Sequence, residues 1–201
     1  MLKVLTKEII INPKAVIFDT DNTLYPYDIA HSAAIDAVKK KSKNTLGISE
    51  KEFSKAYEVA RKDIKLQLGE TASSHSRLLY FQKTIESLGL RTRILVTLDL
   101  EQTYWRTFLT NAKLFAYVRE FILELKSDGV LMANITDLTA QIQFRKMVYF
   151  GLDEHFDYVV TSEEAGHDKP DPRPFQIALD KLKIDPEEIW MIGDSASADM
   201  A

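Results

Sequence analysis

Two aspartates close together are the first residues of the sequence that could do chemistry. Asp19 and Asp21 are two positions apart and follow the short apolar run 15–18. Neighbouring carboxylates repel each other, so the pair favours a nearby hard cation, and oxygen ligands suit magnesium. Asp and Asn also favour turns, which makes an ordinary aspartate-rich turn the alternative. The pair therefore indicates either a cation-assisted site or a turn.

A hydroxyl group and an ammonium group follow at two later positions. Thr136 and Asp137 come after an apolar run, and Lys169 lies in the proline-containing segment 166–172. A hydroxyl can bind a phosphoryl oxygen, and a fixed ammonium near carboxylates can neutralise phosphate charge. The alternatives are that Thr136 or Asp137 caps the next helix, and that Lys169 is an exposed turn residue.

Asp194 would add a third carboxylate to the same place if the apolar runs are neighbouring strands. It follows another apolar run, and Asp199 stands five residues later. Short apolar runs alternate here with segments of helical spacing, which predicts a parallel sheet with helices on both faces. Ligands bind at the carboxyl ends of the strands in such sheets. The expected strands are 15–18, 130–133, 158–160 and 189–192.

The stretch from about residue 28 to 108 has helical patterning and no convincing strand. Ser49 and Glu52 form a capping box, and Gly69 stands where that helix is expected to end. Another helix is expected to begin near Ser74 or Ser76 and to end at Gly89. Such helices bury their apolar faces by packing into a bundle. Later helices are expected at 114–125, 138–149 and 172–183.

The composition excludes several classes of protein. The chain has 201 residues, no cysteine and a formal net charge of -4. A chain without cysteine has no disulfide framework and no thiolate metal site, which is compatible with a reducing cytoplasm. No segment approaches the roughly 20 apolar residues of a membrane span, and the N-terminal segment lacks the layout of a signal peptide. Mild acidity argues against nucleic-acid binding. We expect a cytoplasmic protein whose oligomeric state the sequence leaves open.

Taken together and in this order, the motifs resemble those of the haloacid dehalogenase-like (HAD) hydrolase superfamily. VIFDTDNTLY is similar to its first motif, MANITD to its second, GHDKPDP to its third and MIGDSASAD to its fourth. The resemblance runs from about residue 15 to the end of the chain. It implies an α/β fold, a Rossmann-like parallel sheet with helices on both faces, plus an inserted helical-bundle cap domain of the first cap class. The predicted domains are a core of 1–24 and 110–201 and a cap of 25–109.

The resemblance also implies a mechanism. Asp19 attacks phosphorus and becomes an aspartyl phosphate, while Asp21 serves as general acid toward the leaving oxygen and then as base toward water. Mg²⁺ is implied on Asp19, Asp194 and Asp21, the last through its backbone carbonyl. Thr136 and Lys169 would hold the phosphoryl oxygens. Asp21 favours phosphate chemistry over dehalogenation, because a halide leaves without a proton.

Supporting and specificity residues are further expectations from the resemblance. Asp199 is expected behind the site, where it could bond to Lys169 or a metal-bound water, and Asn134 and Asp137 are weaker candidates of this kind. The cap is expected to select the substrate, with Tyr25 near its entrance and Arg77 able to bind an anionic or ring substrate. Hinge or surface packing is the alternative for both. The implied partner is a small phosphate monoester: a nucleotide, a sugar phosphate or phosphoglycolate.

Other interpretations stay open at this point. A phosphomutase, a phospho-acceptor signalling module and a catalytically impaired relative share parts of the pattern, although Asp21 and the large insertion speak against a signalling receiver. Asn22 stands where the family usually has glycine, a mild change because Asn tolerates the left-handed conformation. The family usually continues with a helix and at least one strand beyond the position of Ala201, so we expect a truncated chain or a second chain that covers the gap.

Overall fold

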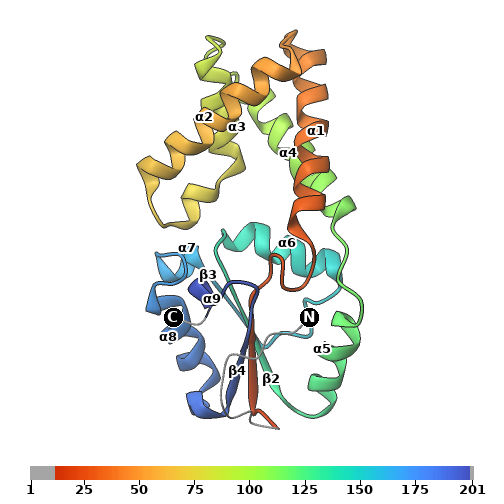
Figure 1. Cartoon of the computed structure of the whole chain (residues 1–201), viewed down its shortest axis with the longest axis vertical. Helices are drawn as coiled ribbons and strands as arrows, with labels where there is room; N and C mark the ends of the chain where they lie inside the picture. The colour runs from red at the N-terminus through yellow and green to blue at the C-terminus, as the bar shows by residue number, and fades with distance from the viewer. Residues whose placement is uncertain (1–11, 200–201) are drawn as a thin grey trace.

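The computed structural model describes residues 12–199. It has two parts stacked along its long axis, a sheet with helices below and a group of helices above (Figure 1). The lower part is a sheet of four parallel strands in the order β3-β2-β1-β4. The first eleven residues of the predicted core segment 1–24 and the last two residues of the chain lie outside the described part. The strands are β1 (Ala15–Phe18), β2 (Leu131–Thr136), β3 (Tyr158–Thr161) and β4 (Ile189–Ile192).

Alternate side chains of the central strand enter two separate apolar clusters, one on each face of the sheet. Val16 and Phe18 pack on one face, and Ala15 and Ile17 on the other. This follows from the two-residue period of a strand, which points successive side chains to opposite faces. The predicted α/β fold with helices on both faces is confirmed. One face is covered by α5 (Val118–Ser127) and α6 (Ala140–Phe150), and the other by α8 (Pro172–Leu182).

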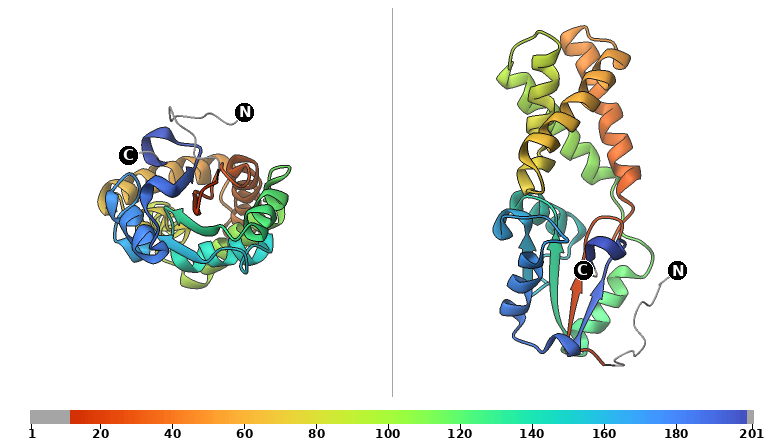
Figure 2. Two further views of the ribbon diagram at one scale, coloured as in Figure 1. Left: turned by 90° about the horizontal axis from the view of Figure 1, so that it is seen from below. Right: turned by 60° about the vertical axis from the view of Figure 1, so that its left-hand side comes forward.

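Four helices form a bundle above the carboxyl ends of the strands, as both figures show (Figures 1 and 2). The helix α1 packs along α4, and α2 packs along α3. Their shared core is aromatic, with Phe53, Tyr80, Phe81, Tyr104 and Phe108 all fully buried. The bounds are α1 (Tyr27–Leu46), α2 (Glu50–Leu68), α3 (Arg77–Ser87) and α4 (Ile94–Asn111), with a 3₁₀ turn at Ala72–His75.

Helix ends follow the local sequence in most places. The capping box of Ser49 and Glu52 is present, and Ser76 caps α3 by accepting a hydrogen bond from the amide of Leu79. The helix expected from residue 114 begins only at Val118, because Tyr117 has a φ of 68° and stands outside the helix as its N-cap. The helix expected from residue 138 begins at Ala140.

The remaining short elements lie near the ends of the strands. They are α7 (Ser162–Ala165), α9 (Ala196–Asp199) and a 3₁₀ turn at Pro186–Glu188. Within residues 12–199, no helix combines the length and the apolar character that crossing a membrane requires.

Candidate active site

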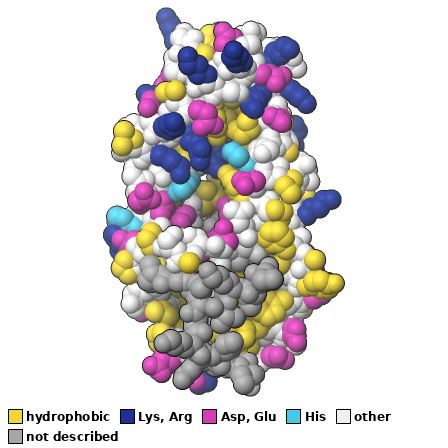
Figure 3. All heavy atoms as spheres, in the orientation of Figure 1, with side chains coloured by type: hydrophobic (Ala, Val, Ile, Leu, Met, Phe, Trp, Pro, Cys, Tyr) yellow, Lys and Arg dark blue, Asp and Glu magenta, His cyan; other side chains and the backbone are white. Residues whose placement is uncertain are grey.

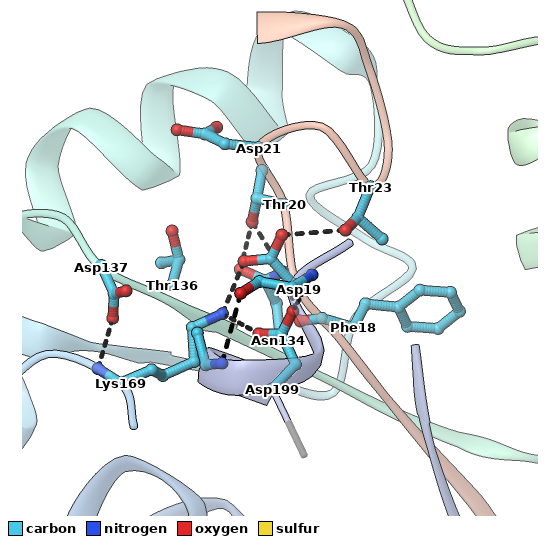
Figure 4. A network of polar contacts seen from close by, with 12 residues as sticks. Phe18, Asp19, Thr20, Asp21, Thr23, Asn134, Thr136, Asp137, Lys169 and Asp199 are labelled. Carbon is cyan, nitrogen blue, oxygen red and sulfur yellow. Dashed lines mark hydrogen bonds and ion pairs between the residues drawn. The ribbon is translucent and has the colours of Figure 1, made fainter. Parts of the chain in front are cut away.

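Asp19 lies at the end of β1, the strand between β2 and β4, and its side chain is fixed from two sides (Figure 4). Its backbone amide donates to the carbonyl of Ile192 at 2.9 Å, which holds the end of β1 against β4. The Thr23 hydroxyl donates to Asp19 Oδ2 at 2.9 Å, and Lys169 Nζ donates to Oδ1 at 2.7 Å. Asp19 is only 7% exposed, so this carboxylate has one defined orientation.

Lys169 joins two carboxylates and is itself held by a third. Its ammonium group, 3% exposed, donates to Asp19 and also to Asp199 Oδ1 at 2.6 Å. Asp137 Oδ1 accepts hydrogen bonds from the Lys169 backbone amide at 2.8 Å and from Ser162 Oγ at 3.2 Å. Asp137 therefore positions the Lys169 loop. Neither Asp137 nor Thr136 caps α6, whose N-cap is Thr139.

Asn134 supports the loop after β1 from the neighbouring strand. Its Nδ2 donates to the Phe18 carbonyl at 2.9 Å and to Thr20 Oγ1 at 2.8 Å, and Gln143 Nε2 donates to the same Thr20 oxygen at 2.8 Å. All of these polar side chains are buried. Buried polar groups that satisfy one another fix a unique backbone path, here the path that presents Asp19. Thr136, at the end of β2, lines the cavity above Asp19.

Three carboxylates come together close enough to hold one cation. Asp19, Asp194 and Asp199 each offer an oxygen, and these oxygens lie within 4.8 Å of one another. Burial raises the pKa of the Asp19 carboxyl to about 6, although the Lys169 ammonium acts in the opposite direction. Burial and the charge of Asp199 likewise raise the pKa of Asp194. In this site the carboxylates outnumber the ammonium groups, and every ligand atom that the cluster offers is an oxygen. Such a site suits Mg²⁺, so these residues fit the expected ion.

Asp21 points away from this cluster and toward α6, as Figure 4 shows. Lys146 Nζ donates to Asp21 Oδ1 at 2.6 Å, and the Tyr25 hydroxyl donates to the same oxygen at 2.5 Å. Burial alone would raise the pKa of Asp21, but the charge and hydrogen bond of Lys146 outweigh it and keep the pKa below its ordinary value. In this arrangement Asp21 is a carboxylate.

A cavity of about 270 Å³ separates the strand ends from the helical bundle. Figure 3 shows Lys and Arg side chains above a hollow near the middle of the molecule, with Asp and Glu beside and below it. The bundle also contacts the core directly, because His75 Nε2 lies 2.8 Å from Asp168 Oδ2 and the Asp168 amide donates to the Glu70 carbonyl. A small ligand in the cavity would therefore contact both parts.

The comparison with known proteins agrees with this geometry. The sequence model described as haloacid dehalogenase-like hydrolase matches residues 13–201, nearly the whole chain. The chain belongs to this family. A ribulose-1,5-bisphosphate 5-phosphatase of Halopiger xanaduensis is 36% identical over 189 residues, covering 93% of this chain and 79% of that protein. A glyceraldehyde 3-phosphate phosphatase of Methanopyrus kandleri is 29% identical over 190 residues, covering 93% and 78%.

The fold of this HAD hydrolase is also that of solved members. The magnesium-bound crystal structure of the HAD hydrolase YfnB from Bacillus subtilis has a TM-score of 0.66 at 18% identity, covering 94% of this chain and 82% of that one. At this identity the likeness concerns the fold alone. The family and the named relatives make the chain an enzyme of the phosphatase type.

One expectation about an individual residue of this HAD hydrolase needs correction. Tyr25 was expected at the entrance to the cap, but it is fully buried and contacts Asp21, so it does not line the cavity. Tyr27 and Arg77 line it instead. The side-chain cluster that could hold a cation contains Asp199. The Asp21 side chain lies apart from it, and the expected metal contact through the Asp21 backbone carbonyl stays a prediction.

Lys146 is a residue of this site that sequence reasoning missed. It is fully buried, and its ammonium lies over the rings of Tyr25 and Phe108. The signal was present in the helical spacing of α6, where Gln143 and Lys146 fall on the same face as Ile142, Met147 and Phe150. A polar residue on the apolar face of a helix needs a buried partner, and for Lys146 this partner is Asp21.

We expect Gly193→Ala to disrupt the carboxylate cluster. A Cβ atom at position 193 would lie 2.1 Å from Asp199 Oδ2, so Asp199 would have to leave its contacts with Lys169 and the Ser195 amide. Overpacking of this kind destabilises a protein by about 1–3 kcal/mol. Chemical denaturation and phosphate release would measure the two losses, and an alanine variant as stable and as active as the parent would contradict this account of Asp199.

We expect a pH-dependent contribution to stability from His31, which stacks on Tyr27 and lies 2.6 Å from the Tyr104 hydroxyl. Burial, with a contribution from the Arg77 charge, lowers the pKa of His31 to about 4. Because the unfolded state binds the proton more readily, the free energy of unfolding falls as pH drops from about 6.5 to about 4. The ring is partly exposed, so the loss is about 1–2 kcal/mol. Denaturation curves of the parent and His31→Gln should converge toward pH 4; parallel curves would contradict the prediction.

Proposed function

We propose that this phosphatase hydrolyses a small sugar phosphate through an aspartyl phosphate on Asp19, with Mg²⁺ as its cofactor. The observation that carries the proposal is the buried Lys169, which bridges Asp19 and Asp199 at the floor of the cavity. Two relatives act, by their names, on phosphorylated sugars of three and five carbons. The proposed partner is therefore a small-molecule ester, and the reducing cytoplasm is the compartment we expect.

Asp19 would act as the nucleophile. Its fixed carboxylate oxygen attacks phosphorus, the bond between phosphorus and the ester oxygen breaks, and an aspartyl phosphate forms. Lys169 and the Thr136 hydroxyl would bind the phosphoryl oxygens, over which the negative charge is delocalised in the transition state of transfer. Mg²⁺ held by Asp19, Asp194 and the backbone after β1 would supply charge neutralisation. Asp199 keeps Lys169 in place, and Asp137 keeps its loop in place.

Asp21 would move protons between the substrate, water and the protein. As the carboxylate seen here, it can accept a proton from the water that hydrolyses the aspartyl phosphate. In the first half of the reaction the leaving alkoxide needs a proton, which Asp21 can donate only when it is protonated and has turned from Lys146 toward Asp19; the proton it accepts from water in one turnover is the one it gives to the alkoxide in the next. The proposed cycle therefore uses two positions of one side chain.

Release of inorganic phosphate from a panel of sugar phosphates, nucleotides and phosphoglycolate tests the proposal. We expect turnover with Mg²⁺ that is highest for sugar phosphates and falls at least about 100-fold after treatment with EDTA, because the carboxylates and the phosphate then repel each other. Full activity in EDTA would rule out the cofactor, and activity confined to nucleotides would rule out the substrate class. No turnover of any ester would favour the binding or signalling interpretation.

A further inference from the structure

The cavity has walls of opposite charge. The core contributes carboxylates around Lys169, whereas the basic residues contributed by the helical bundle are Arg61, Lys65, His75 and Arg77. Among the described residues that line the cavity, no carboxylate comes from the bundle. One end of the cavity thus suits a cation with the reacting phosphate, and the other end suits an anion alone.

Arg61 and Lys65 face the cavity together because they are four residues apart on α2, which puts them on the same side of a helix. Both side chains are exposed. Lys65 forms no ion pair within residues 12–199, and the ion pair of Arg61 is a long contact of 3.9 Å with the exposed Glu58. Two cations without a close ion pair remain available to a ligand.

Arg77 lies deeper in the same wall. Its guanidinium stands over the rings of Tyr80, Tyr104 and Trp105, and it donates to the His75 carbonyl and the Tyr27 hydroxyl. Its Nε is buried and has no hydrogen-bond partner, and its charge acts on the Asp21 carboxylate at the other side of the cavity without a salt bridge between them in the described part of the chain. A partly buried guanidinium that forms no direct ion pair carries a desolvation cost, which would fall if an anionic group of the ligand lay beside it. His75, in contrast, is already paired with Asp168.

We propose that Arg61, Lys65 and Arg77 bind a second, non-reacting phosphate, so that the preferred substrate is a small sugar bisphosphate. The inference rests on the proposed function, in which the first phosphate lies against Asp19 and Lys169. Arginine and lysine are the side chains that bind phosphate oxygens, and a cavity of about 270 Å³ holds a sugar of this size. The second phosphate would also draw the bundle and the core together, because each would hold one end of the same molecule.

The test compares a ketose bisphosphate with the matching monophosphate that lacks the distal phosphate. We expect the parent to prefer the bisphosphate in kcat/KM, and Arg61→Gln with Lys65→Gln to reduce this preference about 10- to 100-fold, as the loss of charge-assisted hydrogen bonds predicts. Lys55→Gln with Lys62→Gln removes the same charge from exposed positions of α2 outside the cavity and is expected to keep the preference. Arg77 is left intact in these variants because its packing among the aromatic rings couples it to folding.

The outcomes separate the inference from the proposed function. A parent that hydrolyses both esters equally well, or a cavity variant that loses both activities in equal measure, overturns the distal phosphate site and leaves the phosphatase mechanism intact. A parent that hydrolyses neither ester overturns the proposed function. In that case calorimetry with Asp19→Asn still decides the inference: it requires that the bisphosphate bind more tightly than the monophosphate, and equal affinities overturn it.

Discussion

Asp19→Asn is expected to lower kcat for sugar phosphate hydrolysis by at least about 10⁴-fold, because the amide cannot form the aspartyl phosphate on which the mechanism depends. We expect the Asn side chain to keep the position of the Asp19 side chain, so that the loss of activity reflects lost chemistry. The Asn side chain has nearly the same shape and can still accept the hydrogen bond that Lys169 donates to Asp19 at 2.7 Å. The substrate should therefore still bind, with a KM or binding constant much closer to that of the parent than kcat is. Rapid-quench phosphate release together with calorimetric binding measures the two quantities separately.

Matched variants make the Asp19 result interpretable. Asp63→Asn makes the same chemical change at an exposed position of α2 and is expected to keep both activity and stability. A labelled phosphate that is trapped on the parent after acid quench and absent from Asp19→Asn would identify the acceptor. Retention of more than about one tenth of the parent kcat would exclude Asp19 as the nucleophile, since single catalytic groups that act as nucleophiles contribute far more than tenfold.

Much of the site could be predicted because its residues lie directly after buried strands. Asp19, Thr136 and Asp194 each follow an apolar run, and parallel strands bring their carboxyl ends to one edge of the sheet. The register confirms the geometry: Phe18 is paired with Asn134 on one side and with Ile192 on the other. Short-range patterns were sufficient here, since topology turns neighbours in the sheet into neighbours in the site.

The remaining residues could not be predicted, because their roles depend on contacts far apart in the sequence. Lys146 and Asp21 are separated by 125 positions, and nothing next to either residue shows that they meet. The spacing of α6 places Lys146 on the apolar face of the helix, but it does not say which carboxylate becomes its partner. Arg61 and Lys65 illustrate the converse case: they are exposed, as expected of a charged helix face, yet the packing of the bundle over the sheet turns that face toward the cavity.

Lys146→Met is expected to lower kcat for sugar phosphates about 10²- to 10³-fold, within the range that general acid–base catalysis contributes. Without the ammonium, Asp21 loses the 2.6 Å hydrogen bond that sets one of its positions, and only Tyr25 holds it. Stability should change much less, by about 1 kcal/mol, because the variant also removes the cost of burying a charge among the rings of Tyr25 and Phe108. Methionine fills a similar volume in that aromatic pocket. Measured on the same preparations, kcat should therefore fall by a much larger factor than the small change in the free energy of unfolding would suggest.

The leaving group distinguishes a role of Lys146 through Asp21 from a structural role. A sugar alkoxide needs a proton as it departs, whereas p-nitrophenolate departs without one. If Lys146 acts by positioning Asp21, then Lys146→Met should slow formation of the aspartyl phosphate from p-nitrophenyl phosphate far less than from a sugar phosphate, and Asp21→Asn should show the same contrast. Rapid quench isolates this step from the later hydrolysis of the aspartyl phosphate, which is common to both substrates. The double variant should be little worse than Asp21→Asn alone, because two residues of one pair are not additive. Equal losses in the formation step on both substrates would instead indicate that Lys146 only supports the packing of α6 beneath the bundle. The contrast between leaving groups thus assigns the buried lysine to proton transfer or to the fold.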